Sequence, residues 1–130
     1  MNSPSRRPAA RGAGTELVVL QLAEELAAWL LTRTMRWPKH ARLSMTSRLE
    51  SLVLDVVEEL VQARYAPAGR LERLDHVNLA LERARYLVRL ARTTNVCSRA
   101  HHEGAMRRLD ELGRTLHGWR ASVRARKKLA

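Results

Sequence analysis

Apolar side chains recur along this chain at the three- and four-residue intervals of amphipathic helices, in four separate segments. No segment alternates apolar and polar residues as a half-buried strand would. The predicted helices run from about Glu16 to Thr34, from near Ser44 to the break at Pro67 and Gly69, from about Leu71 to Thr94, and from about Ser98 to Arg124. Because the connections between them are short, we predict an all-α protein with one antiparallel, up-down four-helix bundle.

Each predicted helix carries an apolar stripe that can form the core. The stripes are Leu49, Leu52, Val53, Val56, Leu60 and Ala63 on the second helix, Leu74, Val77, Leu81, Ala84, Val88 and Ala91 on the third, and Ala105, Leu109, Leu112, Leu116 and Trp119 on the fourth. The first helix is apolar around most of its circumference. So broad an apolar surface suggests burial on two sides, by its own bundle and by a neighbouring subunit.

The ends of the helices and of the domain also have sequence signals. Ser47-x-x-Glu50 is a possible capping box at the start of the second helix, and Ser98 is a plausible N-cap for the fourth. Pro38 should hold Trp37 outside helical geometry. We expect a disordered basic tail at residues 1–14, the bundle at 15–126 and a basic C-terminal end at 127–130.

The positive charge is concentrated in the second half of the chain. Residues 70–128 hold 15 basic and 6 acidic residues, which gives this half a net charge of +9 out of +11 for the whole chain. Many of these arginines lie within predicted helices, so a rigid scaffold would present them to a polyanion such as nucleic acid. The candidate nucleic-acid-binding residues are Arg83, Arg85, Arg89, Arg92, Arg107, Arg108, Arg114 and Arg120.

Other functional classes have weaker support. Cys97 and His101 have the i, i+4 spacing of metal ligands, but no second cluster completes a zinc site. We expect no metal, cofactor or catalytic nucleophile. The Arg-x(4–6)-His pattern of HEPN ribonucleases occurs at Arg70…His76 and Arg33…His40, about as often as chance predicts with this composition.

The location and the state of the cysteine can also be predicted. Glu24 and Glu25 interrupt the apolar run of the first helix, which is too short to span a bilayer, so we expect no membrane segment and a cytoplasmic protein. The single cysteine, Cys97, excludes an internal disulfide and should be a partly buried thiol.

Several stretches resemble one known family when taken in order. They are RWPKHARL at 36–43, SRLE at 47–50, LVQARY at 60–65, LVRLA at 87–91 and LDELGRTLHGW at 109–119. In order and spacing they resemble the Avd accessory proteins of diversity-generating retroelements, part of a wider group of four-helix-bundle proteins related to those encoded in ribosomal-RNA intervening sequences. Trp37 stands where this family has Phe, and arginine replaces much of its lysine.

The resemblance implies a non-enzymatic partner of a retroelement reverse transcriptase that supports adenine-directed mutagenic copying. It also implies a homopentameric barrel that associates with the polymerase and with template RNA or the RNA–cDNA hybrid. Two alternatives stay open. The basic surface could bind an acidic patch on the reverse transcriptase instead of nucleic acid, or the chain could be an intervening-sequence relative of unknown role.

Overall fold

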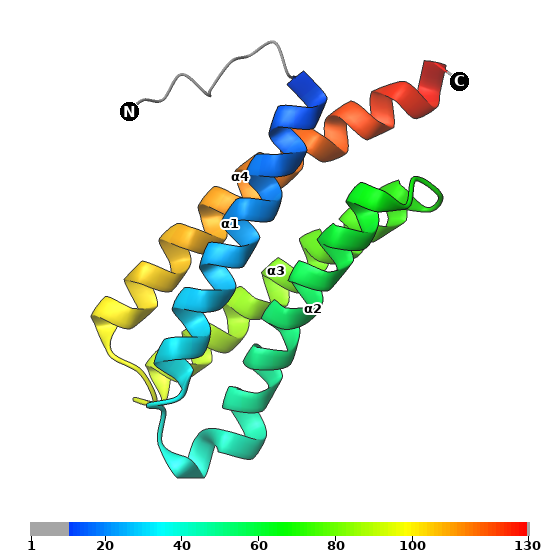
Figure 1. Ribbon diagram of the computed structural model, residues 1–130. Coiled ribbons are helices and arrows are strands. Elements are labelled where there is room, and N and C mark those ends of the chain that lie inside the picture. The colour runs from blue at the N-terminus through cyan, green and yellow to red at the C-terminus, as the bar shows by residue number, and fades with distance from the viewer. Residues whose placement is uncertain (1–10, 130) are drawn as a thin grey trace.

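The computed structural model describes residues 11–129, with side-chain surroundings from residue 14 onward, and consists of helices (Figure 1). The four long ones are α1 (Arg11–Thr34), α2 (Ser47–Tyr65), α3 (Arg70–Thr93) and α4 (Arg99–Leu129). A 3-10 helix, η2 (Lys39–Ala41), and a π-helical turn, η3 (Arg42–Thr46), connect α1 to α2. Residues 11–129 contain no strand, which confirms the predicted all-α class.

The four long helices form the predicted bundle. Each packs against two others, so that α1 and α3 both lie between α2 and α4, and successive helices run in opposite directions (Figure 1). All the core residues predicted on α2, α3 and α4 are buried, and α4 adds Gly104 to them. The largest fully buried side chain is that of Trp119.

Two helices extend further than the apolar pattern predicts. The first begins at Arg11 instead of near Glu16, and α4 continues past Arg124 to Leu129. The last turn of α4 holds Arg126, Lys127 and Lys128, which are good helix formers and favourable partners for the negative end of the helix. The rest of the predicted tail, residues 1–10, and Ala130 lie outside the described residues.

The predicted capping box at the start of α2 is wrong. Thr46 already has helical geometry, with φ −61° and ψ −55°, because the chain enters α2 from η3 without leaving the helical region. The N–H groups at this end therefore need no side-chain cap. The carboxylate of Glu50 instead accepts a 2.7 Å hydrogen bond from the hydroxyl of Thr34 and so links α2 to the end of α1.

A tight turn connects α3 to α4. Asn95 has a left-handed φ of 61°, and the N–H of Val96 then donates to the carbonyl of Ala91 at 2.7 Å. The hydroxyl of Ser98 accepts from the N–H of His101 at 3.0 Å, which confirms the predicted N-cap of α4. This turn fixes the start of α4 beside the end of α1. No helix of residues 11–129 is long and apolar enough to cross a membrane.

Candidate nucleic-acid interface

The eight predicted arginines come from α3 and α4 but point to different sides of the bundle. Arg83 lies on the α2 side of α3, where it lines a hollow together with Asp55 and Glu59 of α2. Arg108 lies on the opposite side of the molecule, against Trp29 of α1. Arg85 and Arg120 lie where α3 meets α4. The arginines therefore do not form one continuous stripe.

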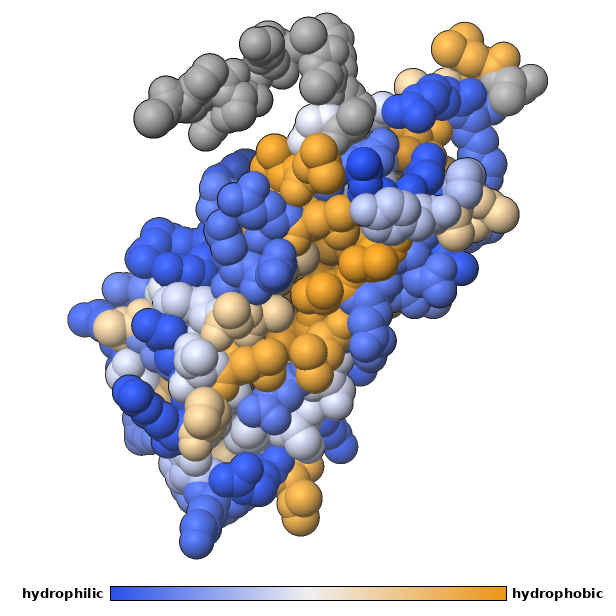
Figure 2. All heavy atoms as spheres, viewed as in Figure 1, coloured by the Kyte–Doolittle hydropathy of each residue, from blue (hydrophilic) through white to orange (hydrophobic). Residues whose placement is uncertain are grey.

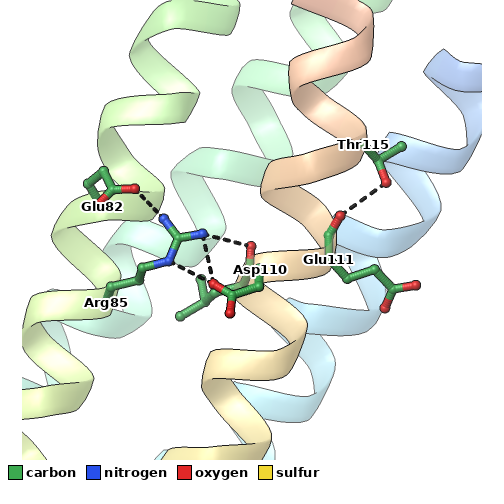
Figure 3. A network of polar contacts seen from close by, with 6 residues as sticks. Glu82, Arg85, Asp110, Glu111 and Thr115 are labelled. Atoms are coloured by element: carbon green, nitrogen blue, oxygen red, sulfur yellow. Dashed lines mark hydrogen bonds and ion pairs between the residues drawn. The ribbon is translucent and has the colours of Figure 1, made fainter.

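Arg85 has a structural role between α3 and α4 (Figure 3). Its guanidinium donates to Asp110 Oδ1 at 3.1 Å and to the carbonyl of Leu109 at 3.3 Å, and it also pairs with Glu82. Only 15% of the side chain is exposed. A Cβ on Gly113 would lie 3.1 Å from Arg85 Nη2, so this glycine leaves room for the guanidinium. Little of Arg85 is free to bind a phosphate.

Arg120 makes a second link between the same helices. Its Nε and Nη2 atoms donate to Asp75 Oδ1 at 3.0 and 2.8 Å, and its side chain is 17% exposed. Arg124 approaches the same carboxylate oxygen at 3.8 Å. Asp75 thus holds α4 against α3 through Arg120 and Arg124.

Three of the predicted arginines surround one hollow between α1 and α4. This α1–α4 hollow has a volume of about 430 Å³ and is lined by Leu22, Glu25, Leu26, Arg107, Arg108, Asp110, Glu111 and Arg114. Arg107 and Arg114 are exposed and form no ion pair with any residue of the described chain. They lie one heptad apart, so both project from the same side of α4. Their charge is available to an anion in solvent.

Arg108 joins this hollow to an aromatic cluster. Its guanidinium carbon lies 4.3 Å from the centre of the Trp29 ring, and that of Arg33 lies 4.1 Å from it. Trp29 can approach α4 this closely because residue 104 is glycine; a Cβ there would lie 2.7 Å from the ring. The sequence places Arg33 one turn after Trp29, but it gives no sign that Arg108 comes to the same ring.

The remaining two predicted arginines lie near the C-terminal end of α3. Arg89 stacks on exposed Tyr86, with 4.4 Å between its guanidinium carbon and the ring centre. Arg92 is half-buried near Cys97. Burial raises the pKa of the Cys97 thiol, and the positive charge of Arg92 opposes that rise. Neither arginine forms an ion pair within residues 11–129.

The extension of α4 adds basic residues that the predicted site left out. Arg124, Arg126, Lys127 and Lys128 are all exposed on the helical end that projects beyond α1 and α2 (Figure 1). The sequence predicts that they belong to the end of the bundle and to a short basic C-terminal segment. A sequence signal was present, because Arg, Lys, Leu and Ala all favour helix, but no apolar stripe continues through these residues.

His101 forms the polar centre of the aromatic cluster. Its ring lies 5.3 Å from that of Trp29 and 5.6 Å from that of Trp37, and its Nε2 atom accepts from the indole N–H of Trp37 at 3.4 Å. Because Nε2 accepts, the ring is neutral, with its proton on Nδ1. Burial, together with the nearby charge of Arg33, lowers the pKa of His101. This histidine therefore adds no positive charge at neutral pH.

Arg70 belongs to the Arg-x(4–6)-His pattern and Cys97 to the possible pair of metal ligands, and the structure places both in other surroundings. Arg70 donates to the carbonyl of Ala63 and, at 3.0 Å, to that of Arg64, so it satisfies the C-terminal end of α2. Cys97 is buried. Within residues 11–129 no three His, Cys, Asp or Glu side chains come together as a metal site would require.

No curated protein and no solved structure matches the chain. A family model described as bAvd-like matches residues 17–123, which include the whole core of the bundle and the α1–α4 hollow. The match agrees with the resemblance to the accessory proteins of diversity-generating retroelements, and on this basis the chain belongs to the bAvd-like family.

Proposed function

We propose that this protein is a non-enzymatic accessory factor of a diversity-generating retroelement that binds nucleic acid along the α1–α4 side and also binds the reverse transcriptase. Family membership supports the accessory role. The observation that carries the nucleic-acid part is the pair Arg107 and Arg114, exposed and outside every ion pair among the described residues. Arg108 extends this basic surface across to α1, and the basic last turns of α4 extend it along that helix toward the C-terminus.

The chemistry of this surface fits a phosphate backbone better than a specific base sequence. Guanidinium groups bind phosphate oxygens through paired N–H donors, and such contacts carry no base information. The Trp29 ring is already stacked by two guanidinium groups, so it offers little surface to a nucleobase. We therefore expect binding that is sensitive to salt, insensitive to sequence and shared by RNA and the RNA–cDNA hybrid.

Paired variants test this surface. Arg107→Ala/Arg114→Ala removes two charges from the α1–α4 side. Arg48→Ala/Arg83→Ala removes two exposed charges from the α2–α3 side, where both arginines line one hollow. In fluorescence anisotropy with single-stranded RNA at low salt, the first variant should bind about tenfold or more weakly, while the second should lose little. Equal losses would show that net charge alone sets the affinity and would reject the site.

The main alternative assigns the same surface to an acidic patch on the reverse transcriptase. Loss of RNA binding by the isolated Arg107→Ala/Arg114→Ala protein supports direct nucleic-acid contact. Loss of polymerase pull-down with RNA binding intact supports the alternative. A reverse transcriptase gene and a paired template and variable repeat beside this gene would support the retroelement role itself.

We also propose that the protein acts as a ring-shaped homo-oligomer, with five copies expected from the family resemblance. Figure 2 shows apolar residues gathered along the seam between α1 and α2. Leu17 and Leu20 of α1 and Leu54, Val57 and Val61 of α2 are exposed or partly buried, and we assign these five residues to the apolar seam. Leu54, Val57 and Val61 share the side of α2 that carries Glu50 and Arg64, which contact α1. A large exposed apolar surface of this kind is typical of a protein interface.

A second apolar surface lies on a different side of the molecule. Leu79, Tyr86 and Leu90 are exposed along α3, and all three line a hollow of about 420 Å³ together with Arg48 and Arg83. Two unlike surfaces on one subunit fit a head-to-tail contact, in which the apolar seam of one copy meets the α3 surface of the next. Such contacts close into a ring when the rotation between copies allows it.

Mixing two variants tests the head-to-tail contact. Val61→Glu should damage the apolar seam and Leu79→Glu the α3 surface, so each variant alone should be monomeric by light scattering. Mixed together, they should form a dimer with one copy of each, because one undamaged pair of surfaces remains. Full assembly of either variant alone would reject this interface, and so would the absence of any mixed dimer.

A further inference from the structure

The pocket at one end of the bundle is not explained by strand binding. It lies where the C-terminal end of α1, the turn after it and the first turn of α4 meet, and has a volume of about 440 Å³. Its lining residues are Trp29, Arg33, Arg36, Trp37, Val96, Cys97, Ser98, Ala100 and His101. We call it the end pocket. Its volume is within the range of sites that hold small ligands.

The end pocket is electropositive. Arg33 and Arg36 are exposed, and neither forms an ion pair with a described residue. No carboxylate is among the residues that line the pocket. By contrast, the α1–α4 hollow contains Glu25, Asp110 and Glu111 beside its arginines. The two guanidinium groups of the end pocket therefore keep most of their charge for a ligand.

The start of α4 adds to this potential. Ala100 and His101 belong to the first turn of this 31-residue helix and line the pocket, as does the N-cap Ser98. The first N–H groups of a helix have no partner within it, and the N-terminal end carries a partial positive charge. The hydroxyl of Ser98 satisfies the N–H of His101, and its carbonyl satisfies the N–H of His102. The N–H groups of Arg99 and Ala100 have no partner within the helix and would be the donors for an anion held by the arginines.

The wall of the pocket also contains a donor without an acceptor. The Nδ1 atom of His101 is buried and has no hydrogen-bond partner among the described residues. It carries the proton of the neutral ring, because Nε2 accepts from Trp37. Because Nδ1 is buried, an acceptor in the pocket would reach this donor only if the ring turned.

We propose that the end pocket binds a phosphate monoester. At pH 7 this group carries a charge of about −1.5 to −2, against −1 for a phosphodiester within a strand, and it has three acceptor oxygens. Two unpaired guanidinium groups and the start of a helix match such a dianion in charge and in donors. The group could come from a free nucleotide or from the 5′ end of a nucleic-acid strand, since both present the same chemistry.

The tryptophans make this proposal directly testable. Trp29 and Trp37 line the end pocket, whereas Trp119 is fully buried in the core. In ¹⁵N–¹H spectra of the full chain, titration with inorganic phosphate, AMP or a 5′-phosphorylated oligonucleotide should shift the indole N–H signals of Trp29 and Trp37 and leave that of Trp119 in place. A stronger response to AMP identifies the free nucleotide as the source, and a stronger response to the oligonucleotide identifies the strand end.

Variants connect the response to the pocket. Arg33→Ala/Arg36→Ala should weaken the binding of AMP and of the phosphorylated oligonucleotide at least tenfold, while Arg42→Ala/Arg48→Ala, a control with two exposed arginines outside the pocket, should bind as the wild type does. Arg36→Glu preserves the stacking of Arg33 on Trp29 and should cause a similar loss, so instability of the double variant would not obscure the result.

The proposal is rejected if no phosphate monoester shifts the two indole signals, or if Arg36→Glu binds as tightly as the wild type. A matched 5′-hydroxyl oligonucleotide separates this inference from the proposed function. If it binds as tightly as the phosphorylated strand, the end pocket is not a phosphate site, although strand binding stands. If neither strand binds but AMP shifts the signals, strand binding is rejected and the end pocket remains.

Discussion

Gly104 shows how a single missing side chain shapes the α1–α4 side. A Cβ at this position would lie 2.7 and 2.9 Å from two atoms of the Trp29 ring, so Gly104→Ala must displace the ring from its place between Arg33 and Arg108. Overpacking of this kind costs about 1–3 kcal/mol, and the better helix propensity of alanine returns up to about 1 kcal/mol. We expect a net loss of about 1 kcal/mol in the free energy of unfolding, measured by urea denaturation.

Gly118 provides the matched control on the same helix. Nothing lies within 4 Å of a Cβ built there, and the residue is exposed. Gly118→Ala should therefore stabilise the protein by about 0.5–1 kcal/mol. The two glycine-to-alanine changes are expected to have opposite signs. Stabilisation by both would show that the ring is free to move and that Gly104 does not determine its position.

His101 should make stability depend on pH. Burial and the charge of Arg33 lower its pKa, so between the folded and unfolded pKa values the unfolded chain binds more protons. The stability that the neutral ring contributes is fully present at a pH above the ordinary histidine pKa of 6.5. It is lost as the pH falls through the lower pKa of the folded state. Protonation would also remove the acceptor for Trp37.

Substitution of the same ring tests this dependence. His101→Gln keeps an acceptor for the Trp37 indole but cannot titrate, so the loss of stability from pH 7.5 to 5.5 in urea denaturation should be smaller than in the wild type. His117→Gln, at an exposed position of α4, should keep the wild-type pH dependence. The same loss in His101→Gln as in the wild type would place the titrating group elsewhere.

At the scale of helices, Arg85 holds α3 and α4 together and Arg114 does not. Arg85→Ala removes hydrogen bonds to Asp110 and to the carbonyl of Leu109 from a mostly buried guanidinium. Its partners Glu82 and Asp110 are about half exposed, so solvent screening limits the loss in the free energy of unfolding to about 1–2 kcal/mol. Arg114→Ala, at an exposed and unpaired position, should change stability by less than about 0.5 kcal/mol. Equal effects in urea denaturation would contradict this division.

The helices themselves were largely predictable, because each one shows its buried side in the sequence. The stripe from Leu49 to Ala63 on α2 and that from Leu74 to Ala91 on α3 are buried as the periodicity predicts. The helix ends were less predictable. The π-helical turn before Ser47 has no sequence signature, and the last turns of α4 lie beyond its apolar stripe, so periodicity could not reveal either.

At the scale of the whole molecule, the sequence shows how much charge there is but not where each charge is used. Arg85 and Arg114 look alike in the sequence, yet one lies in an ion-pair network and the other lies free on the surface. The difference depends on Asp110 and Leu109, which lie on the neighbouring helix. Contacts between helices have no local sequence signal, and for this reason the predicted set of eight arginines mixes structural and available side chains.

The salt dependence of RNA binding shows whether the exposed arginines of α4 hold a nucleic-acid strand. Each lost phosphate contact should reduce the slope of log K against log salt by about 0.7 for a single strand, so Arg107→Ala/Arg114→Ala should flatten it by about 1.4. Arg48→Ala/Arg83→Ala should keep a slope close to that of the wild type. If the wild type shows no salt dependence, or if all three proteins share one slope, then the exposed arginines of α4 do not hold the strand.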